Sequence, residues 1–340
     1  MRANDKLKLH FVNVNHGDAT IIEFPDYDSQ NMAYFAVVDF GAKRAADRGK
    51  AKDYLKELIE LRRNNDNTFD YSIEFVCVTH PHNDHYGGLN RFMNEFSNKV
   101  KMFWDCGFRI NSPDYNSELS RISSNKKITF IRVAAGMEFE FGDTRITVLA
   151  PSVDLGNRFD TYGVDKNNSS IVLKIKFNRS YAILAGDAEF ASWGKSTEEF
   201  PRQERITFFR DALGLAERGE TSDQLKCNLL KISHHGSKHG SSLECLERLK
   251  PRHVVIPAGD QQWYQDNYSN GVGYFPHELT TKILQVLNAS DNLNMQIHTT
   301  GINGNILFKY GAGPGPVDFK SFRESPSDSN FLQVLDTNWA

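Results

Sequence analysis

The sequence predicts a layered α+β fold in which strands and helices alternate along the chain. Segments rich in β-branched and aromatic residues recur between residues 7 and 310. Between them, residues 51–62 and 89–96 carry apolar side chains at helical spacing. Histidine and aspartate side chains gather where predicted strands end. Mixed strands and helices favour layers over an all-β fold.

The composition is that of a soluble globular protein. The 340 residues, 24% charged and 39% hydrophobic, allow one large or two medium domains. Forty Lys and Arg against 43 Asp and Glu leave a net charge of −3, so any nucleic-acid substrate must be attracted locally. We expect no membrane insertion and no secretory signal. Four scattered cysteines without a Cys-x-x-Cys pair favour a reducing, cytoplasmic location.

The first half of the chain predicts six strands and two helices. The strands lie at 7–14, 19–24, 34–40, 73–79, 128–133 and 145–149. The continuous apolar run at 73–79 is typical of a strand that is covered on both faces. The helices lie at 51–62 and 89–96, and the second has its apolar residues at i, i+3, i+4 and i+7.

The second half predicts six strands, two helices and an insertion. Four strands lie at 170–177, 181–187, 229–233 and 253–257, and two more are expected near 295–310. Helices are expected at 242–249 and 279–288, and the charged segment 188–228 forms a helical insertion. The domain organisation is therefore one domain over 1–310, followed by a loosely packed tail over 311–340 that is rich in Ser, Asp and Pro.

One short segment, between a predicted strand and a predicted helix, concentrates ligand-type side chains. His80, His82, Asp84 and His85 place three imidazoles and a carboxylate within six residues. These groups bind borderline metals such as Zn²⁺, and open sites of this kind are typically catalytic. An extended strand end would aim the first three to one side. Chance histidines in a polar loop are the alternative, which the total of 11 histidines disfavours.

A second pair of histidines, His234 and His235, follows the strand at 229–233. Adjacent side chains on an extended chain point to opposite sides, so we do not expect both to bind the same metal. We favour His235 as the ligand and His234 as an outer residue or substrate contact. Two solvated loop histidines are the alternative.

The pattern His80-x-His82-x-Asp84-His85 after an apolar strand resembles the signature of the metallo-β-lactamase fold superfamily. Over about residues 7–310 the chain resembles the soluble hydrolase domain of ComEC-type DNA-uptake proteins. The further motifs, in order, are 13–19, 38–41, 168–173, 184–187 and 230–237. This resemblance implies a four-layer αββα sandwich with metal ligands from loops along one edge.

The resemblance also implies two divalent metal ions, Zn²⁺ first and Mn²⁺ second. It assigns one ion to His80 and His82 and the other to Asp84 and His85. It makes Asp187 the carboxylate that bridges them, although a turn or helix-capping aspartate is the alternative. Residues 86–186 contain no histidine, and the pattern offers Asn168 there as a substitute contact or loop-ordering residue.

Further residues are candidates for outer contacts. Asp18 and Asp39 lie beneath the site in the resemblance and would hold metal-binding histidines, or they are turn residues. Ser237 and Lys238 lie in a Gly- and Ser-rich turn that enters a helix and would contact an anion, or they belong to an ordinary capped helix start. His277 is either a site residue or a surface histidine at a helix start.

We predict a metal-dependent hydrolase, a phosphodiesterase or nuclease that cleaves nucleic acid by a metal-bound hydroxide, with Asp84 or Asp187 orienting the water. One alternative is a hydrolase of a small phosphodiester or ester. Another is a non-catalytic partner-binding protein with a vestigial metal site. No Walker A, Gly-x-Gly-x-x-Gly or Gly-x-Ser-x-Gly motif supports another chemistry.

The insertion at 188–228 and the tail are also candidates for contacts with a second copy or a partner protein. The insertion carries Arg202, Arg205 and Arg210 among aromatic and apolar residues. It packs on the outside of the sandwich, or it forms a wall where Arg side chains contact phosphates and aromatic rings stack on bases.

Overall fold

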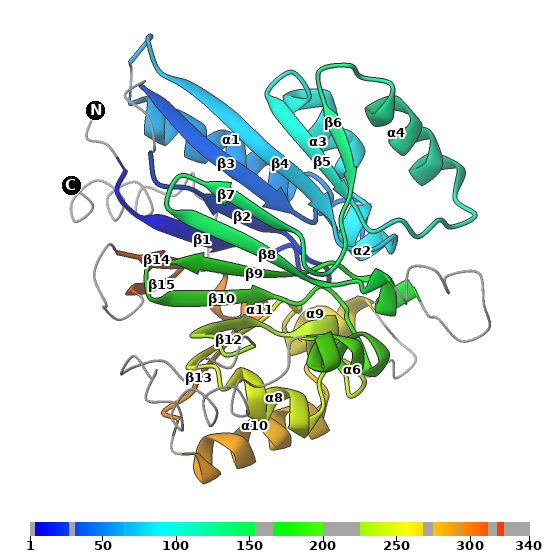
Figure 1. Cartoon of the computed structure of the whole chain (residues 1–340), viewed down its shortest axis with the longest axis vertical. Helices are drawn as coiled ribbons and strands as arrows, with labels where there is room; N and C mark the ends of the chain where they lie inside the picture. The colour runs from blue at the N-terminus through cyan, green and yellow to red at the C-terminus, as the bar shows by residue number, and fades with distance from the viewer. Residues whose placement is uncertain are drawn as a thin grey trace, which may run out of the picture.

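A computed structural model of the chain has its strands in the middle and helices above and below them (Figure 1). It describes residues 4–26, 31–64, 66–153, 166–199, 225–267, 275–291, 293–311 and 318–322. The predicted wall containing Arg202, Arg205 and Arg210 lies outside the described residues.

The first sheet has eight strands in the order β15-β14-β1-β2-β3-β4-β5-β6. Pairing is antiparallel from β15 to β3 and parallel from β3 to β6. The strands are β1 (Leu7–Phe11), β2 (Thr20–Glu23), β3 (Met32–Val38), β4 (Asp70–Val78), β5 (Val100–Asp105), β6 (Thr129–Arg132), β14 (Asn305–Tyr310) and β15 (Asp318–Phe322).

The second sheet has seven strands in the order β13-β12-β11-β10-β9-β8-β7. Pairing is antiparallel from β7 to β10 and parallel from β10 to β13. The strands are β7 (Glu138–Phe141), β8 (Thr144–Ala150), β9 (Val172–Phe177), β10 (Ser180–Leu184), β11 (Leu229–Lys231), β12 (His253–Ile256) and β13 (Gln296–Thr299).

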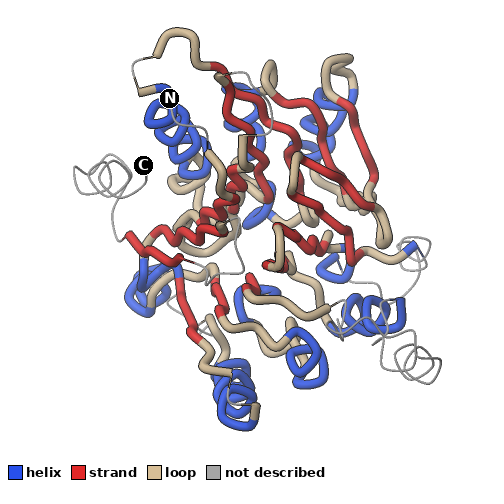
Figure 2. Tube along the Cα trace, turned by 60° about the vertical axis from the view of Figure 1, so that its left-hand side comes forward, coloured by secondary structure: helices blue, strands red, loops and turns tan. Residues whose placement is uncertain are grey.

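Helices lie on the two outer sides of the sheets, as a second view also shows (Figure 2). The α-helices are α1 (Lys50–Arg63), α2 (Asn83–Tyr86), α3 (Leu89–Phe96), α4 (Pro113–Ser123), α6 (Phe190–Glu199), α8 (Leu243–Leu249), α9 (Gln261–Asn267), α10 (Glu278–Ser290) and α11 (Thr300–Asn303). Two short 3₁₀ turns are η1 (Lys166–Ser169) and η2 (Ser233–Gly236). No helix among the described residues is long and apolar enough to cross a membrane.

Three apolar cores lie between the layers and hold them together. Along β3, Phe35 and Val37 pack toward α1 and α3, whereas Tyr34 and Ala36 pack between the sheets, because successive strand side chains point to opposite faces. A third core joins the second sheet to α6, α8 and α10. Three cores between four layers confirm the predicted αββα sandwich.

Some elements differ from the predictions. Strands β5 and β7 and helix α4 were not expected, although Ser112 and Pro113 form a helix-start signal: the Ser112 side chain accepts a hydrogen bond from the Tyr115 N–H at the start of α4. Residues 318–322, assigned to a loosely packed tail, instead form β15. They extend the first sheet by antiparallel pairing with β14, which composition alone does not reveal.

The described start of the insertion packs against the second sheet. Trp193 of α6 is buried in the third core, and the Ser196 hydroxyl donates to the Leu149 carbonyl at 3.0 Å. This part of the insertion therefore covers the outside of the sandwich.

Candidate metal centre

Loops at the carboxyl ends of four strands meet at one edge of the sandwich. Asp39 directly follows β3, and His80 follows its parallel neighbour β4. Asp187 follows β10, and the His234–His235 pair follows its parallel neighbour β11. Parallel strands end at the same edge of a sheet, and this topology brings segments far apart in sequence together.

The first group of side chains surrounds the Asp187 carboxylate. His80 Nε2 is 2.9 Å from His82 Nδ1 and 3.7 Å from Asp187 Oδ2. His85 Nε2 faces the other carboxylate oxygen, Oδ1, at 3.1 Å. The two Asp187 oxygens therefore face different imidazoles, an arrangement that suits a carboxylate between two cations.

These distances pass a simple test for a shared ion. Two ligands at 2.0–2.2 Å from one zinc ion lie no more than about 4.4 Å apart. The three separations given above, from His80 to His82, from His80 to Asp187 and from His85 to Asp187, satisfy this limit. In addition, His85 Nε2 and Asp187 Oδ1 are buried, and neither has a hydrogen-bond partner apart from the other atom, 3.1 Å away. Since incompletely satisfied buried polar atoms are costly, the residues fit a bound cation.

The electrostatics around Asp187 favour a positive charge. Burial lowers the pKa of His85, but the Asp187 and Asp39 carboxylates outweigh burial and hold that pKa well above its ordinary value. Burial raises the pKa of Asp187, but His85, His235 and His80 together outweigh it and hold this pKa well below its ordinary range. The negative potential of these carboxylates, which favours a proton on His85, would also favour a divalent cation at this position.

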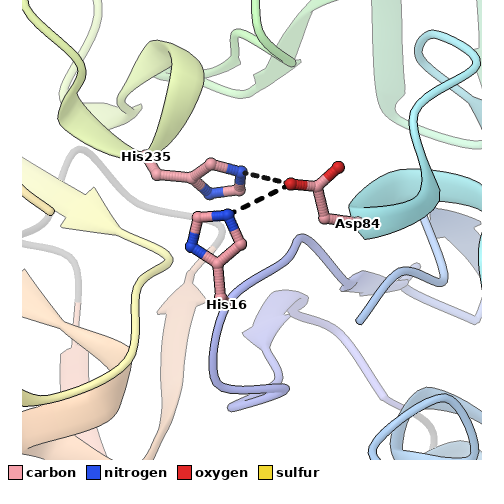
Figure 3. Close-up of side chains that lie close together, drawn as sticks. All are labelled: His16, Asp84 and His235. Atoms are coloured by element: carbon pink, nitrogen blue, oxygen red, sulfur yellow. Dashed lines mark ion pairs between the residues drawn. The ribbon is translucent and has the colours of Figure 1, made fainter. Parts of the chain in front are cut away.

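A second group joins three segments around Asp84, as Figure 3 shows. Asp84 Oδ2 lies 3.2 Å from His16 Nε2 and 3.7 Å from His235 Nε2. One ligand atom from each of the three residues lies within 4.8 Å of the other two. Burial raises the pKa of Asp84, but contacts with His16 and His235 outweigh it and hold the pKa well below its ordinary value.

The predicted divergence of His234 and His235 is wrong, because the chain is not extended there. Both residues lie in η2 with positive φ, 49° and 52°. As a result, both direct Nε2 toward Asp187 Oδ2, at 3.8 Å and 4.0 Å. They differ in burial, since the His234 side chain is 24% exposed and that of His235 is 1% exposed.

Outer partners fix the orientation of these rings. The Asp39 carboxylate lies 2.8 Å from His85 Nδ1, and Asp39 also accepts from Thr79. The His235 Nδ1–H donates to the Pro257 carbonyl at 2.7 Å, so Nε2 is the ring nitrogen that faces Asp84 and Asp187. Metal-binding histidines characteristically have such a partner on the second nitrogen.

Asp18 lies beneath His85, with Oδ2 3.7 Å from Nδ1. Its carboxylate forms a buried ion pair with Lys231 of β11. Lys231 also donates to the Gly186 carbonyl at 3.0 Å, next to Asp187. The structure thus places Asp18 and Asp39 beneath the candidate ligands, in contact with them.

Four other predicted residues lie at the margin of these groups. Asn168 accepts from the Ser192 N–H at 3.0 Å and so orders the start of α6. Ser237 is buried, and Lys238 is exposed. His277 caps α10 by accepting from the Leu279 N–H at 3.1 Å. Asn168 thus orders a loop and His277 caps a helix, and Ser242 likewise caps α8.

The sequence patterns assign no role to His16 or Glu189. His16 stands in the turn between β1 and β2, two residues before Asp18, and only the fold brings it to Asp84. Glu189 accepts from His234 Nδ1 and from Asn167, both at 2.9 Å. Its position two residues after Asp187 is the one sequence signal that could have indicated it.

Comparison with known proteins shows which family the chain matches. The model of the Metallo-beta-lactamase superfamily matches residues 70–259, more than half of the chain. ComE operon protein 3 of Bacillus subtilis (strain 168) is 24% identical over 239 residues, which cover 70% of this chain. The chain spans 25% of the length of that relative.

Solved structures of this fold are also similar. The metallo-beta-lactamase fold protein YhfI from Bacillus subtilis is 11% identical with a TM-score of 0.45, over 87% of this chain and 96% of that one. The diiron beta-hydroxylase CmlA from Streptomyces venezuelae is 13% identical with a TM-score of 0.45, over 88% of this chain and 53% of that one. At these scores neither structure bears on the substrate.

Proposed function

Because the chain belongs to the metallo-beta-lactamase superfamily and gathers imidazole and carboxylate groups at one edge of the sandwich, we propose that it is a metal-dependent phosphodiesterase that cleaves nucleic acid. The observation that carries this proposal is the contact between His85 Nε2 and Asp187 Oδ1. They lie 3.1 Å apart, both are buried, and neither has another hydrogen-bond partner. A cation between them would satisfy both atoms.

The proposed centre holds two divalent ions, with Zn²⁺ favoured by the imidazole-rich ligand set and Mn²⁺ second. His80 and His82 would hold one ion, and Asp84, His85 and His235 the other, with Asp187 contacting both. When bound, such ions lower the pKa of water and polarise a phosphoryl oxygen.

The chain's own residues give this centre its substrate preference. Two carboxylates and neutral imidazoles around two divalent ions leave a net positive charge, which favours an anionic phosphodiester over a neutral ester. The Asp84 side chain is 19% exposed, whereas that of Asp187 is 3% exposed. Asp84 is therefore the carboxylate placed to accept a hydrogen bond from water or from the substrate.

Residues beside the centre favour a polymer with bases. Lys238 and His239, both exposed, lie two and three residues after η2 and would contact phosphates. The Phe275 ring stacks on His234, with centroids 6.3 Å apart, and would offer a face to a base. The resemblance to ComEC-type domains points in the same direction. A small phosphodiester is the alternative substrate.

The test is a cleavage assay on protein loaded with Zn²⁺ or Mn²⁺. Substrates are linear and circular DNA, single- and double-stranded, together with RNA and bis-p-nitrophenyl phosphate. Asp187→Asn should lose both bound metal and hydrolysis, whereas the surface control Asp291→Asn should retain both. Hydrolysis of the small diester alone would favour the alternative, and no hydrolysis of any diester would refute the proposal.

A further inference from the structure

His16 approaches the candidate centre from a segment outside the histidine motifs. The loop between β1 and β2 is held against the start of α2, where the Asp18 N–H donates to the Asp84 carbonyl at 2.9 Å. Gly17 permits this approach, because it has φ of +150° and a Cβ there would lie 2.9 Å from the Asp84 oxygen. The loop therefore fixes His16 opposite the Asp84 side chain.

The ring of His16 is oriented like those of the other candidate ligands. Its Nε2 faces Asp84 Oδ2 at 3.2 Å, and its Nδ1 lies 2.9 Å from the Tyr264 hydroxyl of α9. His85 and His235 show the same arrangement, with Nδ1 on a fixed oxygen and Nε2 toward a carboxylate. Such an outer partner sets which nitrogen is free for a metal.

The surroundings of His16 exclude bulk solvent. The ring is 5% exposed and packs against Trp263 and Phe275, with centroids 6.2 Å and 5.4 Å away. The Asp84 carboxylate and the His235 ring, whose centroid is 4.7 Å from that of His16, lie beside it. Two imidazoles and a carboxylate form a set that divalent metals of the zinc class accept.

We propose that His16 is a metal ligand that shares one divalent ion with Asp84 and His235, and that the Tyr264 hydroxyl orients its ring. This inference rests on the proposed function, because it adds a ligand to the same centre. It implies that the ion contacts loops from both sheets and that α9 is part of the support of the site.

The test measures metal binding without substrate. Metal-free full-length protein is titrated with Zn²⁺ against a chromogenic chelator, and with Co²⁺ while the visible absorption spectrum is recorded. His16→Gln retains an amide that can donate to Asp84 but is a poor zinc ligand. It should weaken one bound equivalent by more than the about 10–100-fold typical of an outer partner, and should change the Co²⁺ spectrum. Tyr264→Phe should weaken the same equivalent by about 10-fold.

The matched control is His253→Gln, which removes an imidazole from β12, where it stacks on His298 away from the centre. It should leave both binding curves and the Co²⁺ spectrum unchanged. Wild-type affinity and spectrum in His16→Gln would overturn the inference. If that variant does not fold by circular dichroism, Tyr264→Phe decides, and unchanged affinity there would overturn it.

Failure of this inference differs from failure of the proposed function. Metal binding that depends on His16 in a protein without phosphodiesterase activity would support the inference and refute the function. Hydrolysis by wild-type protein together with unaltered metal binding in His16→Gln would support the function and refute the inference. A wild-type chain that binds no divalent metal would overturn both.

Discussion

Replacing Gly41 by alanine should damage the candidate metal centre through the backbone alone. The loop after β3 passes directly against the junction of Asp84 and His85. A Cβ on Gly41 would overlap the Asp84 carbonyl carbon and oxygen and the His85 nitrogen. Real Cβ atoms essentially never come within 3.0 Å of such atoms. Since these are backbone atoms, no side-chain rotation relieves the overlap.

The size of the effect follows from the displacement that is required. The backbone at 84–85 must retreat by about 1 Å, a misplacement that can cost about 100-fold where geometry matters. It must also disturb the hydrogen bonds from Asp18 N to Asp84 O and from Phe40 N to His85 O, at 2.9 Å and 2.7 Å. We expect a loss of about 3 kcal/mol in unfolding free energy and at least about a tenfold loss of metal affinity.

Urea unfolding and competitive Zn²⁺ titration measure the two effects separately. The control is Gly194→Ala in α6, where an added Cβ meets nothing within 4 Å. Alanine favours a helix over glycine by about 1 kcal/mol, so this control should be neutral or stabilising. Wild-type stability and metal affinity in Gly41→Ala would refute the reasoning.

Three further predictions concern buried groups. Lys231→Met should cost about 3–5 kcal/mol in urea unfolding, because it leaves the buried Asp18 charge unpaired, and adding Asp18→Asn should recover most of the loss. Burial raises the pKa of Cys106 to about 12 and all four cysteines are buried, so mass spectrometry should find no alkylation by iodoacetamide at pH 8 until urea is added. Burial raises the pKa of Glu23, but Lys8 and the other cations nearby outweigh it and hold the pKa well below 4.5. The stabilisation is therefore present above pH 4.5 and is lost as the pH falls, so Glu23→Gln should lose less stability than wild type between about pH 5 and pH 3.

The helices and strands that were predicted correctly are those with a strong periodic pattern of apolar residues. The helix predicted at 89–96 is α3, Leu89–Phe96, because its apolar residues follow one face without interruption. Strand β15 lacks such a signal, since its antiparallel neighbour β14, not its own composition, determines its pairing. A lone segment of five residues cannot indicate which edge it will join.

The candidate site likewise contains residues that the sequence predicted and residues that only the fold reveals. His80, His82, Asp84 and His85 are close in sequence, so spacing alone indicated a ligand cluster. His16 and Tyr264 are separated by 248 residues, and only the fold brings His16 Nδ1 within 2.9 Å of the Tyr264 hydroxyl. The chain was also expected to be extended at His234 and His235, but both residues lie in a left-handed turn at η2. The cytoplasmic location, the oligomeric state and the contacts of the insertion stay predictions.

Three buried aspartates and the partly buried Asp84 lie at one edge, and the side chains around them compensate their charges only partly. Asp18 is paired with Lys231, and Asp39 faces His85. Asp84 and Asp187 face imidazoles alone. Buried carboxylates without a cation are costly, so proposed metal binding and folding must be coupled. An ion at 100 times its dissociation constant would add about 2.7 kcal/mol to the unfolding free energy, because the ligands come from both sheets and are not assembled in the unfolded chain.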